Sequence, residues 1–178
     1  MDASFLRGIV MKTGYLLLCA AALLSLASPA LAQRDAGSKI RGDAYSVNSG
    51  SMYQSHAHDH ARVLSDYATS GKSVPKAVVK EHSDAIRTNV AAAKKANAGL
   101  SEEAKKEAAK SLAIIEKAHA KVLESCNMLD ECCATGDGDS TTVMECCKTV
   151  ADEIKAAKAE QDKLAKQLKL DTKAPAKK

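Results

Sequence analysis

The sequence predicts an all-α fold, an up-down-up-down antiparallel four-helix bundle, from its composition, its hydrophobic periodicity and its turn signals. Aromatic residues make up only 3% of the 178 residues, whereas the strands of sandwiches and barrels are rich in them. Charged residues make up 27%, and long runs of Ala, Lys, Glu and Leu favour helices. The formal net charge of +4 is mild and both signs are interspersed, so no nucleic-acid partner is expected.

Residues 1–32 are predicted to be a signal peptide, with Met11 as a possible start of translation. Lys12 gives a positive start, an apolar stretch follows, and Ala-Leu-Ala at residues 30–32 forms a small-x-small cleavage signal. The apolar stretch is short for a membrane span, so we expect no stable span after the signal is removed; a membrane anchor is the alternative. The mature protein is therefore expected to be periplasmic or secreted, in an oxidising compartment.

The two segments that flank the expected bundle have a different composition. Residues 33–50 are polar and rich in Gly and Ser, which is typical of a flexible linker. Residues 169–178 hold a proline and four lysines and predict a disordered tail. The four-helix bundle is accordingly expected over residues 51–168.

Turn and capping residues divide this region into helices. Glycines at positions 71, 99 and 136 follow helical patterns, and each is followed by a candidate N-terminal cap. These caps are Ser73 with Pro75 in the first turn, Ser101, and Thr142 with Glu145 as a capping box. The predicted helices are 51–70, 74–98, 101–134 and 140–168, and their short loops make neighbours antiparallel.

Residues three and four apart define the face that each helix turns to the core. In the first two helices this face is expected to hold Tyr53, His56, His60, Val63 or Leu64, Tyr67, Val78, His82, Ile86, Val90 and Ala93. In the last two it is expected to hold Ala108, Leu112, Ile115, His119, Val122, Cys126, Leu129, Cys133, Val143, Cys147, Val150, Ile154, Ala157, Leu164 and Leu168.

Four of the five histidines lie on these stripes, and the first two helices are expected to pair two of them. His60 and His82 each lie 11 residues from Gly71, so an antiparallel hairpin places them side by side. His56 precedes His60 by one turn, a spacing that lets two imidazole rings share one ion. Only His58 is expected to point away.

The third helix is expected to bring His119 to the same level. His82 lies 17 residues before Gly99 and His119 lies 20 after it, a mismatch of about 4.5 Å along the helices. Converging imidazoles suit a zinc or copper ion, and Glu116, one turn before His119, is a further ligand or a partner of one. The alternative is that these histidines are ordinary packed, hydrogen-bonded residues.

Glu116-Lys117-Ala118-His119 resembles the Glu-x-x-His motif of ferritin-like di-iron bundles. That resemblance implies the helical architecture and a metal site between helices. The family carries the motif twice, together with carboxylates from two other helices, whereas this chain carries it once and has histidines at those places. Haem b held between two histidines is a further alternative.

Five cysteines of the mature chain lie near the turn between the third and fourth helices, and this Cys-rich hairpin predicts disulfides. Cys126 lies 11 residues before residue 137 and Cys147 lies 10 after it, so these two are level on facing stripes. A disulfide between them is the preferred interpretation in an oxidising compartment, with Cys132 or Cys133 to Cys146 as a second bridge. An odd number leaves one thiol over.

The same hairpin has a second interpretation as a soft-metal site. The pairs Cys132-Cys133 and Cys146-Cys147, with Met128 and Met144, resemble at a distance the exported copper-storage four-helix bundles, whose cores are lined with cysteine. That resemblance implies binding of Cu(I), which prefers thiolate and thioether ligands.

The predicted function is that of an exported transition-metal-binding protein, for sequestration or transport of the ion, which uses core histidines. The alternative is a structural or stress-related helical module that interacts with other envelope proteins and binds no metal. Enzyme activity is not expected, because the short loops offer no evident substrate pocket and no catalytic motif is present.

Overall fold

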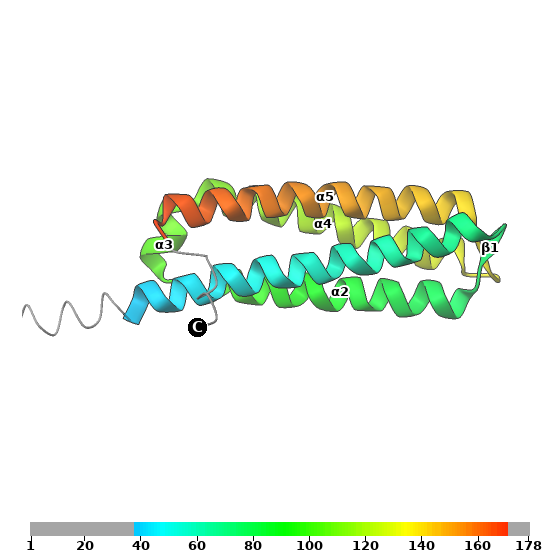
Figure 1. Ribbon diagram of the computed structural model, residues 1–178, viewed down its shortest axis with the longest axis horizontal. Coiled ribbons are helices and arrows are strands. Elements are labelled where there is room, and N and C mark those ends of the chain that lie inside the picture. Colours follow the sequence, from blue (N-terminus) through cyan, green and yellow to red (C-terminus); the bar gives the residue numbers. More distant parts are fainter. Residues whose placement is uncertain (1–37, 171–178) are drawn as a thin grey trace, which may run out of the picture. The chain divides into compact units, whose positions relative to one another are not determined.

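The computed structural model of the protein describes residues 38–170, and this part of the chain is mostly α-helical (Figure 1). The helices considered below belong to the compact unit Arg41–Lys178, apart from residues 38–40 at the start of the first helix. The predicted signal peptide and residues 171–178 of the predicted tail lie outside the described residues.

The first described helix covers residues 38–70 and is called the N-terminal helix below. The elements that follow are β1 (Ser73–Val74), α2 (Lys76–Ala98), α3 (Glu102–Glu107), α4 (Ala109–Cys132), β2 (Gly138–Asp139) and α5 (Ser140–Gln167). The long helices lie side by side, with α3 at one end and β1 at the other (Figure 1). The all-α class is therefore confirmed.

The N-terminal helix begins well before residue 51, so residues 38–50 are helical where the sequence predicted a linker. Tertiary contacts explain the difference. Both carboxylate oxygens of Asp43 accept hydrogen bonds from Ser101, from its backbone N–H at 2.7 Å and from its hydroxyl at 2.8 Å. Val47 is buried in the core beside α3. Gly50 allows close packing, because a Cβ there would lie 3.0 Å from the side chains of Asn97 and Gln161.

The predicted third helix is divided in two at Ala108, whose φ of −98° and ψ of 11° interrupt the regular backbone between α3 and α4. The local sequence contains neither Gly nor Pro at this point. The change of direction is explained by packing, since Leu100, Ala104 and Ala108 all join Val47 in one buried cluster. Ser101 caps α3 as predicted, with its side chain accepting a hydrogen bond from the N–H of Ala104.

Two interhelical turns pair as a two-residue antiparallel sheet that the sequence analysis did not anticipate. Ser73 pairs with Asp139 and Val74 with Gly138. Ser73 is therefore in a strand and does not cap α2, and Asp139 caps α5 by accepting a hydrogen bond at 2.9 Å from the N–H of Thr142. The sheet connects the segment that precedes α2 to the segment that precedes α5.

The buried face of the N-terminal helix differs from the predicted one by about one residue. Its members are mostly small: Gln54, Ala57, Ala61, Leu64 and Ala68. His56, Val63 and Tyr67 are exposed. The reason is that an alanine face lets neighbouring helices approach closely, whereas the larger Tyr and His side chains fit only beside the contact. In α4 and α5 the predicted faces are buried almost completely, apart from the half-buried Leu112 and Leu168.

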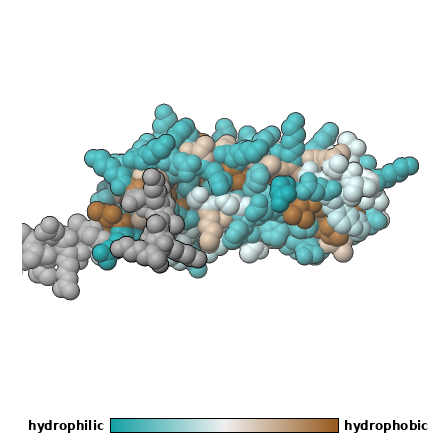
Figure 2. Space-filling view, viewed as in Figure 1, coloured by the Kyte–Doolittle hydropathy of each residue, from teal (hydrophilic) through white to brown (hydrophobic). Residues whose placement is uncertain are grey.

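Hydrophilic side chains cover most of the face in Figure 2, and hydrophobic residues are visible there only as small separate patches. Among residues 38–170, no helix combines the length and the apolar character that a membrane crossing requires.

Candidate functional site

The N-terminal helix and α2 bring His60 and His82 into direct contact, as the hairpin spacing predicted. Their Nδ1 atoms are 3.1 Å apart, the ring centroids are 5.4 Å apart, and the ring planes are inclined by 54°. At this distance one Nδ1–H donates a hydrogen bond to the other Nδ1. Both side chains are half-buried, so the pair is held by the helices and remains open to solvent on one side.

The environment of the pair favours neutral imidazole at His82. Partial burial lowers the pKa of His82, and the charge of a protonated His60 lowers it further, while Glu81 acts in the opposite direction. Neutral imidazole is the form that binds metal ions. The two histidines are therefore a candidate site that could bind one metal ion through two nitrogen atoms.

The structure does not bring His119 to this pair. His119 contacts Gln54, whose Nε2 donates to the Nε2 of His119 at 3.3 Å. Gln54 precedes His60 by six residues, which separates the two contacts by about 9 Å along the helix. Within the described range, no group of three or more His, Cys, Asp or Glu side chains is arranged to hold a metal ion. The predicted meeting of His60, His82 and His119 around one ion is accordingly corrected to a pair.

The other predicted ligands lie around the pair or away from it. His56 lies one turn before His60 and is exposed, so it is near the pair without being part of its contact. Glu116 is exposed, and it lines a cavity of about 140 Å³ together with His119, Lys94 and Lys105. Glu116 therefore accompanies His119 and not the histidine pair.

His119 is a buried polar residue with an incomplete set of hydrogen bonds. It is fully buried, and burial together with the charge of Lys94 lowers its pKa to about 4. Its Nδ1 atom and the Oε1 atom of Gln54 are buried without hydrogen-bond partners among the protein groups described. A polar group in this state destabilises the folded protein unless water or a ligand completes its hydrogen bonds.

Residues 38–170 contain five cysteines, which are free thiols and all buried except Cys132: Cys126, Cys132, Cys133, Cys146 and Cys147. Burial is the main cause that raises the pKa of Cys126 to about 11 and the pKa of Cys147 to about 12. Cys126 belongs to the central core cluster, and Cys147 belongs to the cluster at the β1–β2 end. These thiols pack as small apolar side chains, and their disulfides remain a prediction.

Among the cysteines of residues 38–170, only the vicinal pair Cys132 and Cys133 makes a sulfur–sulfur contact, with Sγ atoms 3.6 Å apart. The methionines predicted to join the thiols lie at different places. Met128 is 50% exposed, and the sulfur of Met144 accepts a hydrogen bond from the Thr69 hydroxyl. The arrangement thus offers a dithiol and not a methionine-rich site.

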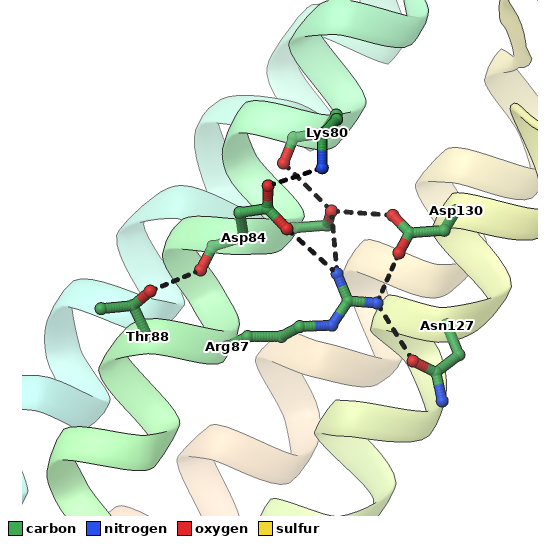
Figure 3. Close-up of polar contacts among 7 residues, drawn as sticks. Lys80, Asp84, Arg87, Thr88, Asn127 and Asp130 are labelled. Atoms are coloured by element: carbon green, nitrogen blue, oxygen red, sulfur yellow. Dashed lines mark hydrogen bonds and ion pairs between the residues drawn. The ribbon is translucent and has the colours of Figure 1, made fainter.

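A polar network between α2 and α4 was missed by the sequence analysis (Figure 3). Arg87 reaches from α2 to Asp130 of α4 at 2.6 Å and to Asn127 at 3.0 Å, and Ser83 donates to Asp130 at 3.0 Å. The helix surfaces are so rich in charges that sequence spacing gives no signal for this pairing. The network connects two helices and stabilises the bundle.

Comparisons of the chain with protein-family models, with curated proteins and with solved structures found no match. The function is therefore inferred from the geometry of these side chains.

Proposed function

We propose that this protein binds a divalent transition-metal ion, zinc or copper, at the His60–His82 pair and acts in its sequestration or transport outside the cytoplasm. The observation that carries the proposal is the 3.1 Å separation of the two Nδ1 atoms. Two nitrogens bound to one tetrahedral zinc ion at about 2.0 Å are about 3.3 Å apart. The pair is therefore close to the spacing that a shared ion requires.

The surroundings of the pair support an exchangeable site more than a closed structural one. Both imidazoles are half-buried, which leaves coordination positions for water. His56 is one turn away on an exposed surface and is the available third ligand. Two fixed imidazoles with open positions give a weaker hold than four protein ligands, as suits an ion that is taken up and released.

The proposal also includes the arrangement of the helices and the cellular compartment of the protein. We infer an up-down-up-down four-helix bundle, and the N-terminal helix has polar contacts with α2, with α4 through Gln54–His119, and with α5 through Ser55–Lys158. The expected signal peptide supports a periplasmic or secreted location. An oxidising compartment is also where disulfides in the hairpin would form.

The proposal is tested by measuring zinc, copper and nickel binding to the purified mature protein by calorimetry and elemental analysis. We expect close to one ion per chain, released when the solution is acidified, because protonated imidazole does not bind a metal ion. His60→Ala and His82→Ala should each remove binding. His58→Ala is the matched control and should bind normally, because His58 is half-buried on the same helix but faces Cys147 of α5 across a groove, away from the pair.

A result in which His60→Ala and His82→Ala bind metal as well as the parent protein would overturn the assignment. His56→Ala tests whether the third ligand is His56 or water. A weaker affinity for the metal ion identifies His56 as the third ligand. An unchanged affinity assigns the remaining positions to water.

A second function, interaction with other envelope proteins, is favoured by one observation. Large hydrophobic side chains are exposed along one flank of the N-terminal helix: Tyr45 at 75%, Met52 at 46%, Val63 at 42% and Tyr67 at 44%. Protein-interaction surfaces are enriched in Tyr and Met. If this function is the correct one, Tyr45→Ser with Tyr67→Ser weakens partner binding and leaves metal binding unchanged.

A further inference from the structure

We propose that the adjacent thiols of Cys132 and Cys133 form a binding site for trivalent arsenic compounds, which form two bonds to sulfur. The site is separate from the histidine pair, does not depend on its function, and belongs to the chain in which Cys132 and Cys133 are both reduced, as they are in the structure. It lies at the C-terminal end of α4, next to the β1–β2 sheet.

The geometry already places both sulfurs on one side of the chain. Their Sγ atoms are 3.6 Å apart, which is a distance that one arsenic atom can bridge. The backbone leaves the helix at Cys133, whose φ of −108° and ψ of 11° mark the end of α4. Adjacent residues within a regular helix point about 100° apart, so this change of backbone at the helix end favours the convergence of the two side chains.

The surroundings of the two sulfurs leave one open direction and one small neighbour. Cys132 is half-buried, while Cys133 is buried, so access is from the side of Cys132. The residue that faces both sulfurs is Gly138, where a Cβ atom would lie 2.7 Å from the Sγ of Cys133 and 3.4 Å from the Sγ of Cys132. Residues 134–137, which follow directly, are exposed.

A second pair in the same chain has the same sequence and a different geometry. Cys146 and Cys147 lie within α5, and both are buried. Their side chains face different flanks of the helix, since Cys146 lines a groove with Met128 and Glu145, and Cys147 lines another with His58. This pair is therefore an internal control for the site at Cys132 and Cys133.

The chemistry is balanced and needs no oxidant. Phenylarsine oxide reacts with two thiols by forming two As–S bonds and breaking two S–H bonds and the As–O bond. Its oxygen leaves with both protons as one water molecule, and arsenic stays trivalent. A monothiol can form only one of these bonds, so the adduct of a dithiol is the more stable one.

The test uses the full mature chain, reduced with a phosphine, treated with phenylarsine oxide and examined by intact mass spectrometry. We expect one adduct per folded chain, mapped to Cys132 and Cys133, resistant to a monothiol and reversed by a dithiol. Cys132→Ser with Cys133→Ser should lose the adduct. Cys146→Ser with Cys147→Ser, the matched control, should keep it, and circular dichroism confirms the fold of both variants.

Two results would overturn the proposal. The first is a folded, reduced protein that forms no stable adduct, although the same protein in guanidinium reacts. The second is an adduct that maps to Cys146 and Cys147. Mapping on the unmodified sequence keeps the test decisive even if the double variant fails to fold.

Discussion

The two ends of the bundle differ in the polar side chains that are buried between the helices. At the α3 end, amide and imidazole side chains are buried between the helices: Gln54, Asn97, His119 and Gln161. At the β1–β2 end, the buried cluster holds Leu129, Val143 and the thiols of Cys133, Cys146 and Cys147. The α3 end therefore combines an apolar cluster with buried hydrogen bonds that must be satisfied, whereas the buried cluster at the β1–β2 end consists of apolar side chains and thiols.

This difference predicts opposite responses to pH. Burial keeps His119 neutral, so the unfolded chain binds a proton more readily and acid destabilises the α3 end. Burial also keeps Cys147 protonated, with its pKa raised from 9.0 to about 12, so the unfolded chain loses that proton first. The β1–β2 end is therefore destabilised as the pH rises above about 9. Near neutral pH neither group opposes folding.

The largest effect is expected from Leu129→Ala at the cysteine end. Leu129 is fully buried, so its truncation leaves a cavity and lowers the free energy of unfolding by about 2–5 kcal/mol. The loss, measured by urea denaturation, should be the same at pH 7 and pH 5, since no titrating group is involved. Met128→Ala, at the exposed neighbouring position, should change stability by less than about 0.5 kcal/mol. An equal effect of both changes contradicts the assigned core.

The second effect is acid destabilisation through His119. The pKa of His119 is about 4 in the folded protein, against 6.5 for the ordinary side chain. The free energy of unfolding is therefore unaffected by this group above pH 6.5 and falls as the pH is lowered from 6.5 to 4. The loss reaches roughly 3 kcal/mol. His119→Gln removes the titrating group and should flatten the pH profile of urea denaturation. A variant that keeps the slope of the parent protein assigns the acid sensitivity to another group.

The sequence predicted the buried faces of α4 and α5 well and that of the N-terminal helix poorly, for a physical reason. In α4 and α5 the buried residues are large and apolar, such as Ile115, Leu129 and Ile154, so the periodicity identifies the correct face. In the N-terminal helix the buried face is largely alanine. The larger His56 and Tyr67 were predicted to be buried, but both are exposed. Large side chains are therefore a poor guide to the buried face of a helix that packs closely through small side chains.

The histidine site was predicted only in part, because counting residues works along regular helices and fails across an interruption. Counting residues from one turn correctly paired His60 with His82, because both helices are regular up to that turn. Counting across Gly99 to His119 failed, because the interruption at Ala108 and the contact with Gln54 are tertiary effects. The pairing of β1 with β2 was also missed, because no local sequence pattern indicates it.

The third effect concerns the amide pair at the α3 end. Gln161 donates to the side-chain oxygen of Asn97 at 2.9 Å, and Asn97 donates back at 3.4 Å. Asn97→Ala leaves Gln161 buried with unsatisfied groups and should cost about 1–3 kcal/mol. Asn97→Leu with Gln161→Met replaces both partners by apolar groups and should recover most of that loss in thermal denaturation. If the double variant is as unstable as the single one, shape and not hydrogen bonding governs this position.

The smallest effect is expected from the exposed network between α2 and α4 (Figure 3). Arg87 is 27% exposed and Asp130 is 47% exposed, so solvent weakens their interaction, and Arg87→Gln should cost up to about 1 kcal/mol. The cost should fall when the salt concentration is raised, because salt screens exposed charges. Arg62→Gln is the control: the Arg62–Asp66 pair is more exposed and lies within one helix, so its removal should have no measurable effect. A double-mutant cycle of Arg87→Gln with Asp130→Asn isolates the coupling, and a coupling of zero means that the contact adds nothing to the packing of α2 against α4.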